Sequence, residues 1–174
     1  MGGDRMNRVY TRIDTLRKYV DEMLLQNEDL NERRCGYVHL YGVGMAAALI
    51  ALKRGFDPEL AEMAGLLHDY ITYQGYDGPE HAHHGAPVVR ALLESINITT
   101  KEETDLIVQA VYHHSDKDRI DSKFDELLKD ADCLQHWLRN PMEPLFREQE
   151  RVEKLSIEFG LQRDLLPYLS EKSI

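Results

Sequence analysis

Histidine and aspartate residues that could bind a metal ion recur through this sequence of 174 residues. They are His39, His68, Asp69, His84, His114 and Asp132. Most lie at the ends of predicted helices or on their apolar seams; His39, for example, shares a helical line with Val43 and Ile50. An isolated buried charge is very costly, so several such groups pointing inward indicate one shared cation. Imidazole and carboxylate donors together suit Fe, Mn, Ni, Co or Zn, whereas Ca prefers oxygen ligands.

Each of these residues, taken alone, has an ordinary structural explanation. A single histidine on an apolar helix face is often a hydrogen-bonded core residue, and Asp132 could pair with Lys129 or Arg139. The set is more informative, because it places one candidate ligand group on each of five successive predicted helices. That arrangement predicts a metal centre built between helices.

The chain pattern predicts helix after helix, without alternating strands or internal repeats. A first amphipathic helix ends in the polar segment 26–34, and a second helix, apolar most of the way round, covers about 35–54. Gly55 is a natural end for the second helix, and Asp57-Pro58 is a strong start signal for a third.

The second half of the chain continues this alternation of helices and loops. Residues 70–83 form a predicted long loop, and a helix over about 85–95 follows. Residues 99–102 (TTKE) indicate a capping box that begins the next helix. Two more helices are predicted, one around 124–134 and a last one over about 145–159.

These elements predict an all-α fold, a single-domain helical bundle of about seven or eight helices. Its parts would be an N-terminal helix over 1–34 packed on the core, a metal-binding core over 35–140, and C-terminal helices of the same domain over 141–174.

Charge and hydropathy limit the partners that we expect. The formal net charge of -10 disfavours duplex nucleic acid, because phosphate contacts need clustered Lys and Arg. The longest weakly polar run, 42–52, is shorter than a membrane span, and the N-terminus lacks a secretory signal. We therefore expect a cytoplasmic protein without a membrane partner; a homodimer is compatible with the sequence.

The order of the candidate ligands resembles a known pattern, H…HD…H…H…D. It is carried by His39, by the segment AGLLHD at 64–69, by His84 and His114, and by Asp132. This pattern is similar to that of the HD-domain superfamily of metal-dependent phosphohydrolases, and it covers about residues 35–136. The resemblance implies an HD-domain-like helical fold.

The resemblance also implies a ligand set and a reaction. His39, His68, Asp69 and Asp132 would bind a first divalent ion. In the branch of the superfamily with two ions, Asp69 would also bridge to a second ion bound by His84 and His114, so one or two ions are expected. Asp69 and His68 would be central to catalysis. A metal-activated hydroxide would then attack a phosphate monoester, a diester or a nucleotide polyphosphate.

Several positions have neighbours that compete for the same role. His113 competes with His114 and Asp130 with Asp132, and in each pair we favour the second residue. His81 and His83, beside His84, are expected to support ligands or lie in the loop rather than bind metal.

The substrate is expected to be a small phosphorylated molecule, most simply a nucleotide. Lys117, Arg119, Arg34 and Tyr73 are candidate contacts for it. Thr72 stands where related polyphosphate hydrolases carry a Lys, and no Glu follows within 70–74. These departures leave two alternatives open: a non-catalytic nucleotide sensor, and a mixed-valent di-iron oxygenase with the same ligands.

Overall fold

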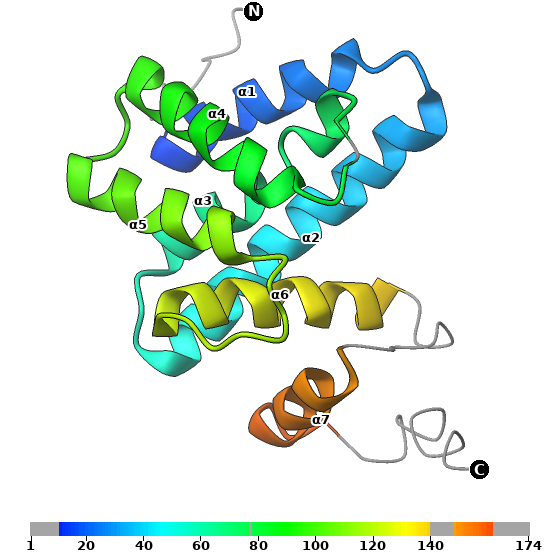
Figure 1. Cartoon of the computed structure of the whole chain (residues 1–174), viewed down its shortest axis with the longest axis vertical. Helices are drawn as coiled ribbons and strands as arrows, with labels where there is room; N and C mark the ends of the chain where they lie inside the picture. The colour runs from blue at the N-terminus through cyan, green and yellow to red at the C-terminus, as the bar shows by residue number, and fades with distance from the viewer. Residues whose placement is uncertain (1–10, 77, 140–147, 162–174) are drawn as a thin grey trace, which may run out of the picture.

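The computed structural model describes residues 11–76, 78–139 and 148–161. Within these ranges the chain forms seven α-helices and one short 3₁₀ helix, η1 (Figure 1). They are α1 (Arg12–Gln26), α2 (Leu30–Arg54), α3 (Pro58–Leu67), η1 (Thr72–Gln74), α4 (His81–Ile96), α5 (Lys101–His113), α6 (Lys123–Arg139) and α7 (Gln149–Glu158). The prediction of an all-helical fold is confirmed; of the last predicted helix, 145–147 lie outside the described residues.

Several helix ends follow from local signals in the sequence. The side chain of Asp57 accepts hydrogen bonds from the first backbone N–H groups of α3, and Pro58 occupies the first helical position. Gly55 ends α2 with a φ of 77°, a left-handed conformation that glycine adopts without strain. The capping box of α5 lies one residue later than expected, between Thr100 and Glu103.

Two helices begin earlier than the sequence pattern predicted. α2 begins at Leu30 rather than near residue 35, because Asp29 caps the backbone N–H groups of Asn31 and Glu32. Most of the polar side chains at 31–34 are exposed on its first turn, so their polarity marks a solvated helix face rather than a linker. α4 begins at His81 rather than near residue 85, so His81, His83 and His84 all lie on its first turn.

The helix α2 is the centre of the core and packs against both α3 and α6 (Figure 1). At its crossing with α3 the two backbones touch, because a Cβ atom placed on Gly65 would lie only 2.6 Å from the Cα atom of Gly44. Both of these glycines are buried. The crossing brings the helix that carries His39 against α3, which His68 directly follows.

By length and composition alone, α2 could also cross a membrane. It has 25 residues, and half of its most apolar stretch is buried inside the fold. The expectation that no segment meets this criterion was wrong, since it considered only the uninterrupted run 42–52. A core helix passes the same test, and α2 packs against α3 and α6.

Candidate metal centre

A first cluster of ligand atoms forms where α2, the end of α3, and α6 meet. The Nε2 atoms of His39 and His68 lie 3.0 Å apart, and each is 3.3 Å from Oδ2 of Asp69. Oδ1 of Asp132 lies 3.7 Å from Nε2 of His39 and 3.8 Å from Nε2 of His68. His39, His68 and Asp132 are all buried. The structure thus brings together the four residues expected around a first ion.

A second cluster forms on the other oxygen of the same carboxylate. Oδ1 of Asp69 lies 3.2 Å from Nε2 of His81 and 3.2 Å from Nε2 of His114. These two Nε2 atoms are 3.1 Å apart. The two oxygens of Asp69 therefore face two separate pairs of imidazoles, as a bridging carboxylate requires.

The histidines of both clusters share one hydrogen-bonding arrangement. Their Nδ1 atoms each lie 2.7–3.1 Å from an oxygen acceptor: Gln135 Oε1 for His39, Gly65 O for His68, Gly78 O for His81 and Val111 O for His114. A neutral ring that donates from Nδ1 keeps its lone pair on Nε2. Lone pairs facing each other at about 3 Å would repel, so the arrangement fits a cation between them.

Two buried carboxylate oxygens in the clusters are also suited to bind a cation. Oδ1 of Asp69 and Oδ1 of Asp132 have no hydrogen-bond donor of acceptable geometry among the described residues. Burial raises the pKa of both carboxyls, but nearby histidines, and Lys117 beside Asp132, outweigh it and hold each pKa below its ordinary value. Both groups are therefore ionised, and a divalent cation is a chemically suitable partner for such oxygens.

Lys117, a candidate substrate contact, lies beside two of the clustered residues. Its Nζ donates to Oδ2 of Asp132 at 2.6 Å and to the carbonyl of His114 at 2.7 Å, so it supports two ligands instead of facing a substrate. Burial lowers the pKa of Lys117, but Asp132 raises it above its ordinary value. The ammonium group is thus a fixed positive charge that holds Asp132 in place.

His84, expected in the second cluster, lies outside it, and His81 takes its place. His84 is exposed, and its ring contacts the ring of Tyr76. The reason is the phase of α4: His81 precedes the buried Gly85 by four residues, whereas His84 precedes the exposed Val88 by four. The early start of α4 therefore decides which histidine faces Asp69.

The competing neighbours have other partners. His113 binds the buried Asp125 through Nδ1 at 2.9 Å, and His83 binds Glu80 through Nδ1 at 2.6 Å. Asp130 forms ion pairs with the guanidinium groups of Arg54 and Arg151 at 2.8 and 2.9 Å. The geometry therefore favours His114 over His113 and Asp132 over Asp130 in the clusters.

The remaining candidate substrate contacts differ in their position. Arg119 is exposed and lies 3.6 Å from Asp121, and Arg34 is exposed with a bond to Asn31, so neither contacts the clusters. Tyr73 is close, with its ring centroid 6.4 Å from that of His39. His136, which was not among the residues predicted from the sequence, shares a candidate cluster with His39 and Asp132. Its four-residue spacing from Asp132 was the available signal.

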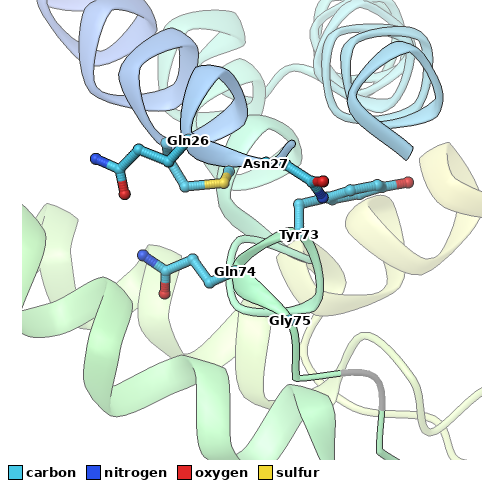
Figure 2. Close-up of a pocket in the computed structure, with 6 residues that line it drawn as sticks. Gln26, Asn27, Tyr73, Gln74 and Gly75 are labelled. Atoms are coloured by element: carbon cyan, nitrogen blue, oxygen red, sulfur yellow. The ribbon is translucent and has the colours of Figure 1, made fainter. Parts of the chain in front are cut away.

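A pocket of about 580 Å³, lined in part by Tyr73, lies between the end of α1 and η1. It is lined by Met23, Gln26, Asn27, Tyr73, Gln74 and Gly75 (Figure 2). The side chains of Gln26 and Gln74 extend to the same side, away from the ring of Tyr73. Tyr73 therefore borders both an uncharged, amide-lined pocket and the His39 ring.

Comparison with known families bears directly on these clusters. The family model of the HD domain matches residues 36–137, which include every residue of the two clusters. The chain belongs to the HD domain family. HD domains bind divalent metals and are generally metal-dependent hydrolases, and the clusters described above could hold such ions. No curated protein and no solved structure matches the chain.

Proposed function

We propose that this HD domain is a phosphohydrolase that uses two divalent metal ions. The observation that carries the proposal is the carboxylate of Asp69, whose two oxygens each lie 3.2–3.3 Å from two imidazole Nε2 atoms. The ions would come from the group Fe, Mn, Ni, Co and Zn, which accept mixed nitrogen and oxygen donors. Bound there, they would polarise phosphate oxygens and lower the pKa of water.

The residues of the two clusters would bind one ion each, and other residues would orient them. His39, His68, Asp69 and Asp132 would hold one ion, and His81 and His114 with Asp69 would hold the other. Lys117 keeps Asp132 oriented, and the carbonyl acceptors keep the Nε2 lone pairs aimed inward. The ions would also attract an anionic substrate to a chain whose net charge is -10.

The amide-lined pocket suggests what lies beyond the phosphate. Its lining residues carry no formal charge, and carboxamides offer donors and acceptors side by side. Such a surface suits a neutral group with hydrogen-bonding edges, so we propose a nucleotide whose base lies in the pocket. A variant with both Gln26→Ala and Gln74→Ala should then raise KM for a nucleotide and leave KM for bis-p-nitrophenyl phosphate, which has no base, unchanged.

The reaction is tested on the purified protein loaded separately with Mn²⁺, Co²⁺, Ni²⁺, Zn²⁺ or Fe²⁺. Phosphate or nitrophenol release is measured from p-nitrophenyl phosphate, bis-p-nitrophenyl phosphate and a panel of nucleotides. We expect metal-dependent turnover that Asp69→Ala abolishes, while Asp118→Ala, at an exposed aspartate outside the clusters, retains it. Tight nucleotide binding by the metal-loaded protein without any turnover would contradict the proposal.

A further inference from the structure

His136 has the same arrangement as the four clustered histidines. Its Nδ1 lies 3.2 Å from Oε1 of Glu148, and its Nε2 lies 3.5 Å from Oδ1 of Asp132. A carboxylate that accepts the Nδ1–H of a histidine leaves the Nε2 lone pair free to bind a metal. The ring also stacks on that of His39, with centroids 5.0 Å apart and an angle of 16° between the planes.

The oxygen that His136 faces is one of the two carboxylate oxygens of the clusters that have no hydrogen-bond donor among the described residues. Three Nε2 atoms lie around Oδ1 of Asp132, at 3.5 Å from His136, 3.7 Å from His39 and 3.8 Å from His68. Asp132 and His136 are four residues apart on α6, so both side chains project from the same face of the helix. The position of His136 thus follows directly from that of Asp132.

The histidines outside the clusters lack this combination. His113 and His83 each bind a carboxylate through Nδ1, but the Nε2 atom of neither lies against Asp69 or Asp132. His84 contacts the ring of Tyr76. An oxygen acceptor at Nδ1 together with an unpartnered carboxylate oxygen at Nε2 is therefore a specific feature, which among these residues only His136 shares with the clustered four.

We propose that His136 is a further ligand of the first metal ion, oriented by Glu148. This inference rests on the proposed metal centre. It would combine two groups of possible ligands that share His39, one with His68 and Asp69 and the other with Asp132 and His136, into five ligands for the first ion. The second ion would keep three, Asp69, His81 and His114. The first ion should therefore be bound more tightly than the second. Glu148, which orients His136, is the N-cap residue of α7, so this end of α7 contributes to the centre.

The test is a Co²⁺ titration of the full chain, followed by equilibrium dialysis and by visible absorption. Removing the imidazole with His136→Ala should weaken the tighter Co²⁺ site by at least about tenfold and change its absorption spectrum. Glu148→Gln keeps the shape of the orienting group without its charge and should weaken the site less. His84→Ala is the matched control, because it removes an imidazole outside the clusters and should change neither readout.

The possible results separate this inference from the proposed function. Unchanged Co²⁺ affinity and spectrum in a folded His136→Ala protein would overturn the inference and leave the two-ion proposal standing. Absence of Co²⁺ binding by the wild-type chain would overturn both. If His136→Ala does not fold, as judged by its circular dichroism, the result for Glu148→Gln decides: an affinity equal to that of the wild type overturns the inference.

Discussion

The ammonium group of Lys117 lies 2.6 Å from Oδ2 of Asp132 and leaves the other oxygen of that carboxylate facing the histidines. One oxygen is thus held by the protein, and the other is presented to the centre. Lys117 also donates to the carbonyl of His114, so a single buried cation connects ligands of both clusters. Before any metal binds, this cation is the main counter-charge for Asp132.

Replacing Lys117 should therefore destabilise the metal-free protein more than the metal-loaded one. Lys117→Met leaves a buried carboxylate without its partner, which costs about 3 kcal/mol in the free energy of unfolding. A bound ion would compensate part of that loss. Urea unfolding with and without Co²⁺ measures both values. Lys154→Met removes an exposed ion pair with Glu150 and should change the stability little in either state. Equal losses for both variants would contradict the role of Lys117 as the partner of Asp132.

His81 and His84 should differ in their effect on metal content. His81→Ala removes one of the three ligands of the second ion and should reduce the metal content from two ions toward one per chain. His84→Ala should leave it unchanged, because His84 is exposed and lies outside the clusters. Elemental analysis after dialysis gives the count. A loss of metal on His84→Ala, with none on His81→Ala, would restore the arrangement expected from the sequence.

Metal binding should strengthen as the pH rises. Burial lowers the pKa of His39, but Asp69 and Asp132 outweigh it and raise that pKa above its ordinary value; contact with Asp69 also raises the pKa of His81. In the metal-free fold, this stabilisation is present at low pH and is lost as the pH rises through the raised values. Metal ions must displace the same protons.

The increase in melting temperature caused by Co²⁺ should therefore be larger at about pH 8 than at about pH 6. Thermal unfolding with and without Co²⁺ at the two pH values measures it. Calorimetry in buffers with different ionisation enthalpies should also detect proton release on binding. An equal increase in melting temperature at both pH values, with no protons released, would show that the histidines are already neutral.

The sequence was sufficient wherever one local signal decides the structure. Asp57-Pro58 and Gly55 mark a helix start and a helix end through their own backbone chemistry, and the structure has both where they were predicted. His39, His68 and Asp132 lie on apolar seams, so their inward direction follows from helical periodicity. These positions need no knowledge of the neighbouring helices.

The site residues that were not predicted from the sequence are positioned by packing between helices. Residues 81–84 offer three imidazoles in four positions, and only the docking of the buried face of α4 selects His81. The partner of Lys117 is 15 residues away, and the contact of His136 with Glu148 requires that the chain return to α6. Neither contact can be predicted from a local sequence pattern. The four-residue spacing of Asp132 and His136 could, however, have predicted that the two share a helix face.

Adding a single methyl group at the crossing of α2 and α3 should separate the first cluster. Gly65→Ala places a carbon against the backbone of Gly44, and such overpacking costs about 1–3 kcal/mol. Gly85→Ala is a matched control in α4, because its added carbon makes only ordinary contact with Ile71 and removing a helical glycine gains about 0.5–1 kcal/mol. Thermal unfolding should show a lower melting temperature for Gly65→Ala and a slightly higher one for Gly85→Ala. A Gly65→Ala protein at least as stable as the wild type would contradict the tight crossing.

The crossing of α2 and α3 also determines how far substitutions elsewhere in the core can change the distance between His39 and His68. Where side chains separate two helices, each change of volume between them alters the distance between their axes. Here the contact is backbone on backbone, so the distance between α2 and α3 at this point is already at its minimum. Substitutions elsewhere along the two helices can tilt them, but they cannot bring them closer. Most substitutions in the core should therefore leave the distance between His39 and His68 unchanged. Substitutions of Gly44 or Gly65 should change it.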